Sequence, residues 1–139
     1  MEYYKLGEDK QKVAELTKEA GFYADSVYAS CLAAEFFLKS VMNRVPEAQE
    51  FEFTHDVINL YFAIKRKYPS SKDLEEAVKY CRKYNNESRY PYSGIGVFTD
   101  NFAAQFLSYV KDIRYYVDEE CRATIEDLKN KFNKSQEKN

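Results

Sequence analysis

Apolar side chains recur along this chain at spacings of three and four residues, which is the period of an amphipathic α-helix. The most regular stripe extends for about five turns up to Pro46. It consists of Val27, Cys31, Ala34, Leu38, Val41 and Val45. No segment alternates apolar and polar residues as a half-buried strand does. The pattern therefore predicts an all-α fold.

Prolines divide this pattern into separate helices. Pro46, Pro69 and Pro91 each follow a helical stretch, and a helix usually ends before a proline. The first helix is marked by Leu6, Val13, Leu16 and Ala20. The stripes between the breaks predict about five helices, near residues 6–20, 27–45, 57–68, 74–84 and 102–132. We expect one up-and-down helical bundle over residues 1–132, followed by a polar tail at 133–139.

Glycine and small polar residues predict where these helices begin and end. Gly21 is expected to end or bend the first helix. Thr54 is the expected N-cap of the third helix, which places His55 and Asp56 in its first turn. The other expected N-caps are Ser70 or Ser71 for the fourth helix and Thr99 or Asp100 for the last.

Charge and hydropathy exclude some classes of function. The formal net charge is −2 and the pI about 5.6, so the whole molecule does not attract nucleic acid and any RNA contact must be local. The N-terminus is aromatic and charged, unlike a signal peptide, and no apolar run has the length of a membrane span. We expect a cytoplasmic protein with no membrane association.

The three cysteines, Cys31, Cys81 and Cys121, lie far apart within helical patterns. Such thiols are typical of small buried core residues in a reducing compartment. With one histidine and no close cysteine pair, the chain offers no zinc site, and we expect neither a metal nor a cofactor.

Aromatic residues are unusually abundant, with 13 tyrosines and 10 phenylalanines. Thirteen tyrosines cannot all be buried with their hydroxyls hydrogen-bonded, so some must lie at a surface or an interface. We therefore expect a homodimer, with the second helix, the final helix or residues 85–98 contributing to its interface.

The segment from Glu87 to Gly94 is the main candidate for a functional site. It belongs to the only long irregular stretch within the domain, and Arg89 must lie near a helix end because Pro91 follows Tyr90. Arg89 could bond helix carbonyls or a carboxylate of a neighbouring helix. Alternatively, Arg89 with Tyr90 and Tyr92 could bind a nucleotide or another anion.

Two further positions have alternative interpretations. Glu35 and Lys39 are four residues apart and could form a solvated ion pair, or Glu35 could point into the bundle and take a basic partner there, for which Arg89 is the candidate. His55 could fix the connector before the third helix to the bundle, or it could serve as a catalytic base.

Basic residues also cluster as Lys65-Arg66-Lys67, Lys79, Arg82 and Lys83, and those of the fourth helix could form a local anion-binding face. Arg82 and Lys39 are further candidate contacts to a nucleotide or another anion. Interleaved glutamates make a solvated face the simpler interpretation. Gly94-Ile95-Gly96 alone does not form a phosphate-binding loop.

Four blocks in order give the chain a resemblance to the HEPN domain (higher eukaryote and prokaryote nucleotide-binding). Residues 33–40 are similar to the A-A-E-x-x-L-K-A helix of that family, and residues 53–57 to its T-H-D-L helix start. Residues 84–91 resemble its Y-x-x-x-R-Y-P turn, and an aromatic final helix follows from Thr99. The resemblance covers roughly residues 8–120.

The resemblance implies a helical bundle that often dimerises and that pairs with a minimal nucleotidyltransferase, in toxin–antitoxin-like systems among others. The proposed roles in the family are nucleotide binding or, in one branch, metal-independent RNA cleavage through an R-x(4–6)-H motif. Here no histidine follows Arg89, and Arg44 is too far from His55, so the motif is absent.

The resemblance therefore favours a non-nuclease HEPN module that binds a nucleotide, an RNA or a nucleotidyltransferase partner. Two alternatives remain: an RNase-type toxin with a variant active site around Arg89, and a purely structural dimerisation bundle. An RNase without a positioned imidazole would lose a proton-transfer group that is typically worth a hundredfold or more in rate.

Overall fold

The computed structural model describes residues 2–87 and 98–122 of the chain. Within these ranges every regular element is helical, so the predicted all-α fold class is confirmed. The α-helices are α1 (Tyr3–Glu19), α2 (Tyr23–Lys39), α3 (Val57–Lys67), α4 (Glu75–Glu87) and α5 (Asp100–Tyr115). Two 3₁₀ turns, η1 (Met42–Arg44) and η2 (Pro46–Phe51), follow α2, and a π-helical segment, η3 (Tyr116–Arg122), follows α5.

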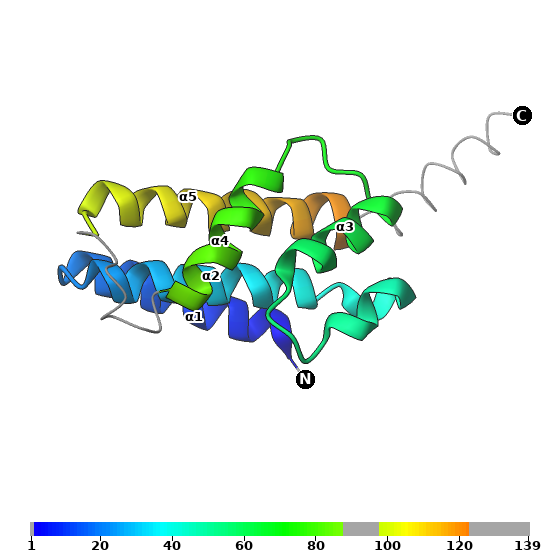
Figure 1. Cartoon of the computed structure of the whole chain (residues 1–139), viewed down its shortest axis with the longest axis horizontal. Coiled ribbons are helices and arrows are strands. Elements are labelled where there is room, and N and C mark those ends of the chain that lie inside the picture. The colour runs from blue at the N-terminus through cyan, green and yellow to red at the C-terminus, as the bar shows by residue number, and fades with distance from the viewer. Residues whose placement is uncertain (1, 88–97, 123–139) are drawn as a thin grey trace, which may run out of the picture.

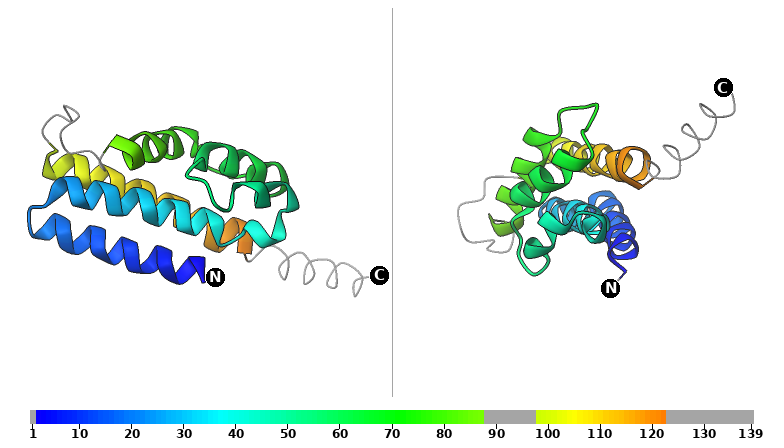
Figure 2. Two further views of the ribbon diagram at one scale, coloured as in Figure 1. Left: turned by 60° about the horizontal axis from the view of Figure 1, so that its bottom comes forward. Right: turned by 90° about the vertical axis from the view of Figure 1, so that its right-hand side faces the viewer.

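The long helices α1, α2 and α5 form the body of the bundle (Figure 1). α1 and α2 are antiparallel, and α5 lies along α2 in the same direction as α2. α4 crosses this pair at a tilt and points the opposite way, so the up-and-down order holds for α1, α2, α4 and α5. α1 packs on one side of α2 and α5, while α3 and α4 pack on the other side (Figure 2).

Helix α2 is the centre of the core. Its alanines and serines have short side chains, so neighbouring helices approach it closely, and Phe37 and Leu38 fill the space between them with 0% exposure. Gly7 of α1 lies directly against Phe37: a Cβ atom at position 7 would be 2.8 Å from the ring. Ser26 secures the other end of this helix pair by donating a hydrogen bond of 2.7 Å to the carbonyl oxygen of Ala14.

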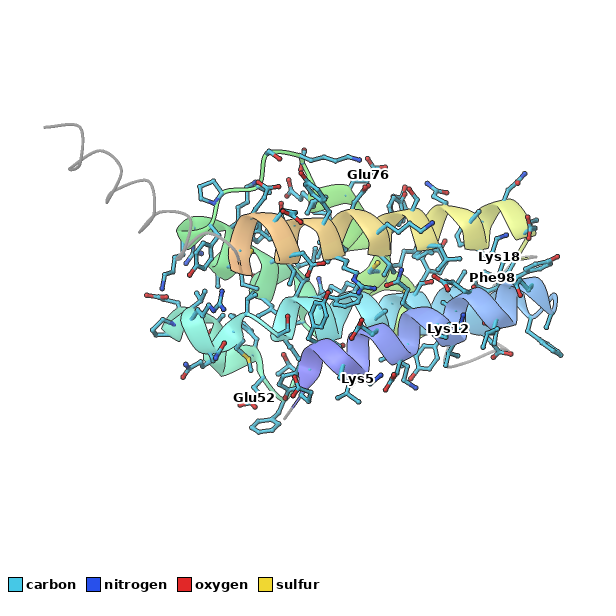
Figure 3. The ribbon with its side chains drawn as sticks, turned by 180° about the vertical axis from the view of Figure 1, so that it is seen from behind. Lys5, Lys12, Lys18, Glu52, Glu76 and Phe98 are labelled. Carbon is cyan, nitrogen blue, oxygen red and sulfur yellow. The ribbon has the colours of Figure 1, made fainter. Side chains whose placement is uncertain are left out.

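The most apolar positions of α1 do not face the core. Its buried face consists of Gly7, Gln11 and Ala14, whereas the side chains of Val13 and Leu16 are 41% and 51% exposed. Figure 3 views the bundle from behind, with α1 in front and its outward side bearing Lys5 and Lys12. The stripe that marks this helix in the sequence is therefore largely a surface stripe.

Two of the predicted helix ends are confirmed. Gly21 follows α1 with φ of 84°, a left-handed conformation that glycine adopts without a steric penalty. Thr99 is the N-cap of α5, where its side chain accepts a hydrogen bond of 3.1 Å from the backbone N–H of Phe102.

Two predicted caps are wrong. The N-cap of α3 is Asp56, whose carboxylate accepts from the backbone N–H of Asn59 at 3.3 Å, and not Thr54. The hydroxyl of Thr54 instead donates to the carbonyl oxygen of Phe51 at 3.2 Å, within the preceding turn. Ser71 does not cap α4, because its N–H and hydroxyl bond the carboxylate of Glu120 at 2.7 and 2.9 Å.

Helix α2 ends at Lys39, earlier than the apolar stripe predicts. Ser40 donates its hydroxyl to the carbonyl oxygen of Phe37 at 2.6 Å, which competes with continued α-helical bonding. The chain then tightens into 3₁₀ turns. Val41 and Val45 remain at 0% exposure, so the stripe indicates burial correctly beyond the point where the α-helix stops.

The last helix widens into a π-helix after Tyr115. Arg44 donates a hydrogen bond of 3.2 Å to the carbonyl oxygen of Cys121 in this segment, and the Tyr116 hydroxyl donates to the carbonyl oxygen of Tyr68. The predicted continuation of this helix to residue 132 lies outside the described residues. In the described ranges no helix combines the length and the apolar character needed to cross a membrane.

Candidate functional site: a buried charge cluster at Glu35

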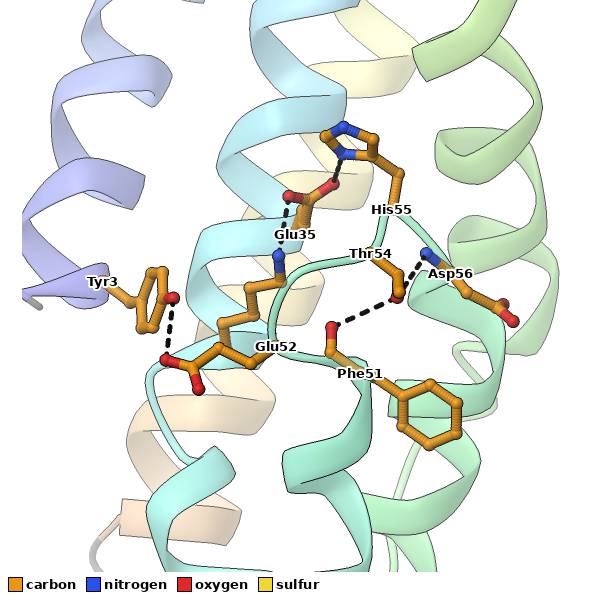
Figure 4. A network of polar contacts seen from close by, with 8 residues as sticks. Tyr3, Glu35, Phe51, Glu52, Thr54, His55 and Asp56 are labelled. Carbon is orange, nitrogen blue, oxygen red and sulfur yellow. Dashed lines mark hydrogen bonds and ion pairs between the residues drawn. The ribbon is translucent and has the colours of Figure 1, made fainter.

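Glu35 is a carboxylate buried in the middle of the bundle, with a side chain only 2% exposed. It lies on α2, and Lys39 follows one turn later on the same face. The Lys39 ammonium is 3.2 Å from one carboxylate oxygen, and Nδ1 of His55 is 2.8 Å from the other (Figure 4). Both oxygens of Glu35 therefore have a basic partner, as a buried carboxylate requires.

The connector between η2 and α3 brings His55 to this carboxylate. Tyr3 of α1 donates a hydrogen bond of 3.3 Å to Glu52 at one end of the connector. Thr54 bonds back to Phe51, and its oxygen accepts the N–H of Asp56 at 3.4 Å (Figure 4). These bonds shape the turn that directs the imidazole toward α2.

His55 is held in one orientation by this contact. An ionised carboxylate can only accept a hydrogen bond, so Nδ1 carries the proton in the contact with Glu35. The side chain of His55 is 46% exposed, whereas that of Glu35 is enclosed. The sequence allowed a structural or a catalytic role for His55, and this geometry favours the structural role: the imidazole ties the connector to the bundle.

A polar pocket of about 370 Å³ lies beside Lys39. It is lined by Glu2, Tyr3, Tyr4, Lys39, Ser40, Met42, Asn43 and Glu52. The Lys39 ammonium also lies 5.9 Å from the centre of the Tyr3 ring. Burial raises the pKa of Tyr3, and the carboxylate of Glu52 raises that pKa further. The pocket thus contains fixed charges of both signs, with Lys39 already bonded to Glu35.

The other candidate residues from the sequence are not gathered at this cluster. Arg82 is exposed on α4, and no contact in the described part of the structure joins it to Lys39. Its neighbour Lys79 pairs with Glu75 at 3.3 Å, as the solvated-face interpretation predicts. Arg89, Tyr90 and Tyr92 lie outside the described residues, so the predicted pairing of Glu35 with Arg89 stays a prediction.

Arg114 is an important charged residue that the sequence analysis did not single out. From α5 its guanidinium donates to the Gln11 side-chain oxygen at 2.8 Å, to Glu8 at 3.0 Å and to the Tyr4 hydroxyl at 3.2 Å. It also lies 5.2 Å from the centre of the Phe37 ring. Arg114 therefore ties α1 to α5. The sequence feature that could have indicated this role is an arginine flanked by the apolar stripe residues Ile113 and Val117 on the final helix.

The three cysteines are buried and unpaired, which confirms their prediction as core residues. Burial raises the pKa of Cys31 well above its ordinary value, with its neighbour Cys81 contributing, and burial also raises the pKa of Cys121, to about 12. Thiols that stay protonated are poor nucleophiles. Within residues 2–87 and 98–122, no three side chains of the metal-binding types are grouped so as to hold an ion.

Comparison with known proteins identifies a family for this chain. Neither a curated protein nor a solved structure matches the chain. The model of the HEPN domain matches residues 1–121, which include all five α-helices and the blocks around Glu35 and His55. The match covers most of the 139 residues, and this chain therefore belongs to the HEPN domain family.

Proposed function

We propose that this protein is a non-catalytic HEPN module that acts by binding, with a nucleotide or a nucleotidyltransferase partner protein as its ligand. The observation that carries the proposal is the position of the only histidine in the chain, both in the sequence and in the fold. His55 contacts the buried Glu35 at 2.8 Å and stands ahead of Arg89 in the sequence, not four to six residues after an arginine.

Cleavage of RNA without a metal needs a group that moves a proton beside the phosphate-binding arginine. The hydroxyl groups near Arg89 in sequence belong to two serines and two tyrosines, and an unperturbed tyrosine has a pKa of about 10. At neutral pH such a group removes a proton poorly. An arginine without a base still binds phosphate well, because its guanidinium offers paired N–H donors to phosphate oxygens.

Two measurements on the purified full-length protein test the proposal. The first incubates fluorescently labelled RNA with the protein in EDTA and follows cleavage over hours; we expect none. The second titrates a fluorescent ATP analogue by anisotropy. We expect weak, salt-sensitive binding that falls at least tenfold in Arg89→Ala and is unchanged in Arg66→Ala, a control on the exposed face of α3.

The outcomes separate this proposal from its alternatives. Cleavage that survives His55→Ala but disappears in Arg89→Ala would contradict it and identify a variant RNase site. If the analogue does not bind, co-expression with a nucleotidyltransferase encoded beside this protein tests the partner role. A stable complex supports that role. If neither the nucleotide nor the partner binds, the proposal is wrong and the purely structural bundle is favoured.

A further inference from the structure

The polar pocket beside Lys39 lies where α1 begins, α2 ends and the connector before α3 begins. Its volume of about 370 Å³ is within the range of pockets that hold small molecules. Figure 4 shows two of its lining residues, Tyr3 of α1 and Glu52 of the connector, which a hydrogen bond of 3.3 Å joins. We call this cavity the α1 pocket. Its other lining residues are Glu2, Tyr4, Lys39, Ser40, Met42 and Asn43.

The fixed charges that line the α1 pocket leave it negative. The Lys39 ammonium lies 3.2 Å from the Glu35 carboxylate, so its charge is already balanced. Glu2 and Glu52 form no salt bridge with another residue in the described part of the chain. The N-terminus of α1 supplies about half a positive charge, which two carboxylates exceed. The α1 pocket therefore attracts a cation and not a phosphate.

The hydroxyl groups of the α1 pocket have already used their protons. Ser40 donates its hydroxyl to the carbonyl oxygen of Phe37 at 2.6 Å, and Tyr3 donates to one carboxylate oxygen of Glu52. Both hydroxyl oxygens can still accept a hydrogen bond, as can the Glu2 carboxylate and the second oxygen of Glu52. A ligand of this pocket therefore has to bring hydrogen-bond donors.

A primary ammonium group suits these acceptors better than a metal ion does. It carries one positive charge and three N–H donors, and it accepts nothing. Calcium and magnesium ions take about six or more oxygen ligands, whereas no three side chains of the metal-binding types are grouped in the described ranges. The rings of Tyr3 and Tyr4 and the methylene stem of Lys39 supply apolar surface for the carbon chain of an amine.

We propose that the α1 pocket binds a small alkyl amine in its ammonium form. The ammonium group donates hydrogen bonds to the carboxylates of Glu52 and Glu2 and to a hydroxyl oxygen between them, and the carbon chain lies against the tyrosine rings. The inference is independent of the nucleotide and partner roles proposed above, because those roles rest on Arg89 and not on this pocket.

Isothermal titration calorimetry of the full chain with putrescine (1,4-diaminobutane) tests the inference, in an amine-free buffer of about 20 mM ionic strength, where charges are weakly screened. We expect saturable binding. 1,4-Butanediol has the same carbon chain without a charge and should not bind. Tetramethylammonium has the charge without N–H donors and should bind at least tenfold more weakly. Failure of putrescine to saturate, or equally tight binding of either control compound, would overturn the inference.

Two matched variants test whether the amine binds in the α1 pocket. Glu52→Gln should weaken putrescine binding at least tenfold. Glu50→Gln is the same change at an exposed glutamate two positions away that does not line the pocket, and it should leave the affinity unchanged. Equal losses in the two variants would show a general attraction to negative surface charge, and the inference would be wrong.

Two further variants separate the Glu52 charge from its structural bond. Tyr3→Phe removes the hydrogen bond to Glu52 but keeps the ring and the carboxylate, so putrescine should still bind. A loss as large as in Glu52→Gln would contradict direct contact with that carboxylate. Glu2→Gln changes an exposed side chain that makes no capping hydrogen bond, so it leaves the fold intact and should weaken binding several-fold. Parent-like affinity there would contradict the arrangement with two carboxylates.

The amine site and the nucleotide role give separate results. Binding of the fluorescent ATP analogue should be the same in Glu52→Gln as in the parent, because the analogue is an anion and is not expected in a negative pocket. An ATP affinity that falls tenfold in Glu52→Gln would show that the α1 pocket takes the nucleotide, and the amine inference would then be overturned.

Discussion

Glu35 places a negative charge where water does not reach it, and its two basic neighbours offset the cost of that burial. The two neighbours differ in their own environments. Lys39 is 6% exposed and contacts Glu35 from the same helix. His55 is half-exposed and lies in a connector, twenty positions from Glu35 in the sequence. Of these two partners, Lys39 is therefore the one whose removal leaves the carboxylate more poorly compensated.

Replacing Lys39 by methionine should destabilise the protein by about 3 kcal/mol, because it removes the buried ammonium that partners a buried carboxylate. The double variant Glu35→Gln/Lys39→Met should recover part of this loss, since it removes the stranded charge as well. Urea unfolding followed by circular dichroism measures both values. Lys111→Met, at an exposed position of α5, provides the control, and an equal midpoint for Lys39→Met and the parent would contradict the buried pair.

Part of this cluster could be predicted from the sequence and part could not. The spacing of Glu35 and Lys39 predicts an ion pair on one helix, and that pair is present. Its burial depends on which side of α2 faces the other helices, and α2 is apolar nearly all round, so its pattern does not single out a side. The contact with His55 depends on the path of the connector, where the predicted cap, Thr54, was wrong.

At the level of the elements, α1 and α2 approach each other closely. This approach depends on Gly7, whose missing side chain leaves room for the Phe37 ring. The same approach fixes which side of α1 faces inward. A small residue carries little weight in a hydrophobic pattern, and so the sequence stripe of α1 indicated a helix without showing that its apolar side faces outward.

Gly7→Ala should therefore destabilise the protein, although alanine is the better helix former by about 1 kcal/mol. The added methyl group would lie 2.8 Å from a ring that is itself fully buried, and overpacking of this kind typically costs about 1 to 3 kcal/mol. Thermal unfolding measures the net effect. In a Phe37→Leu background the clash is relieved, and there Gly7→Ala should become neutral or stabilising; a loss of the same size in both backgrounds would show that the ring is not its cause.

At the scale of the whole molecule, buried acidic groups that remain protonated make stability depend on pH. Burial raises the pKa of Cys121 to about 12 and also raises the pKa of Tyr116. In the unfolded chain a cysteine loses its proton near pH 8.5. The folded state then holds protons that the unfolded state has released, so its stability is fully present below that pH and decreases as the pH rises toward the folded value.

We expect the free energy of unfolding to fall between about pH 9 and pH 12, by about 1.4 kcal/mol per pH unit for the cysteine and, above about pH 10, by a similar amount for the tyrosine. Cys121→Ala removes one of the groups and should make the fall less steep, even though the loss of the thiol lowers stability at neutral pH. Urea unfolding at a series of pH values measures the slope. Tyr115→Phe, at an exposed tyrosine, should leave the slope unchanged, and an unaltered slope in Cys121→Ala would contradict the assignment.

The π-helical segment at the end of α5 has a consequence for the evolution of the chain. A π turn holds one residue more than an α turn, so Tyr116, Val117 and Cys121 can all be buried there while the helix axis continues. Deleting a single residue between 116 and 122 would restore the regular α-helical register. It would also move side chains that now contact other elements, because Tyr116 packs on Tyr61 of α3 and Asp118 accepts a hydrogen bond from Tyr4 of α1. One deletion event in this segment would thus change the contacts of the last helix with two other helices at once.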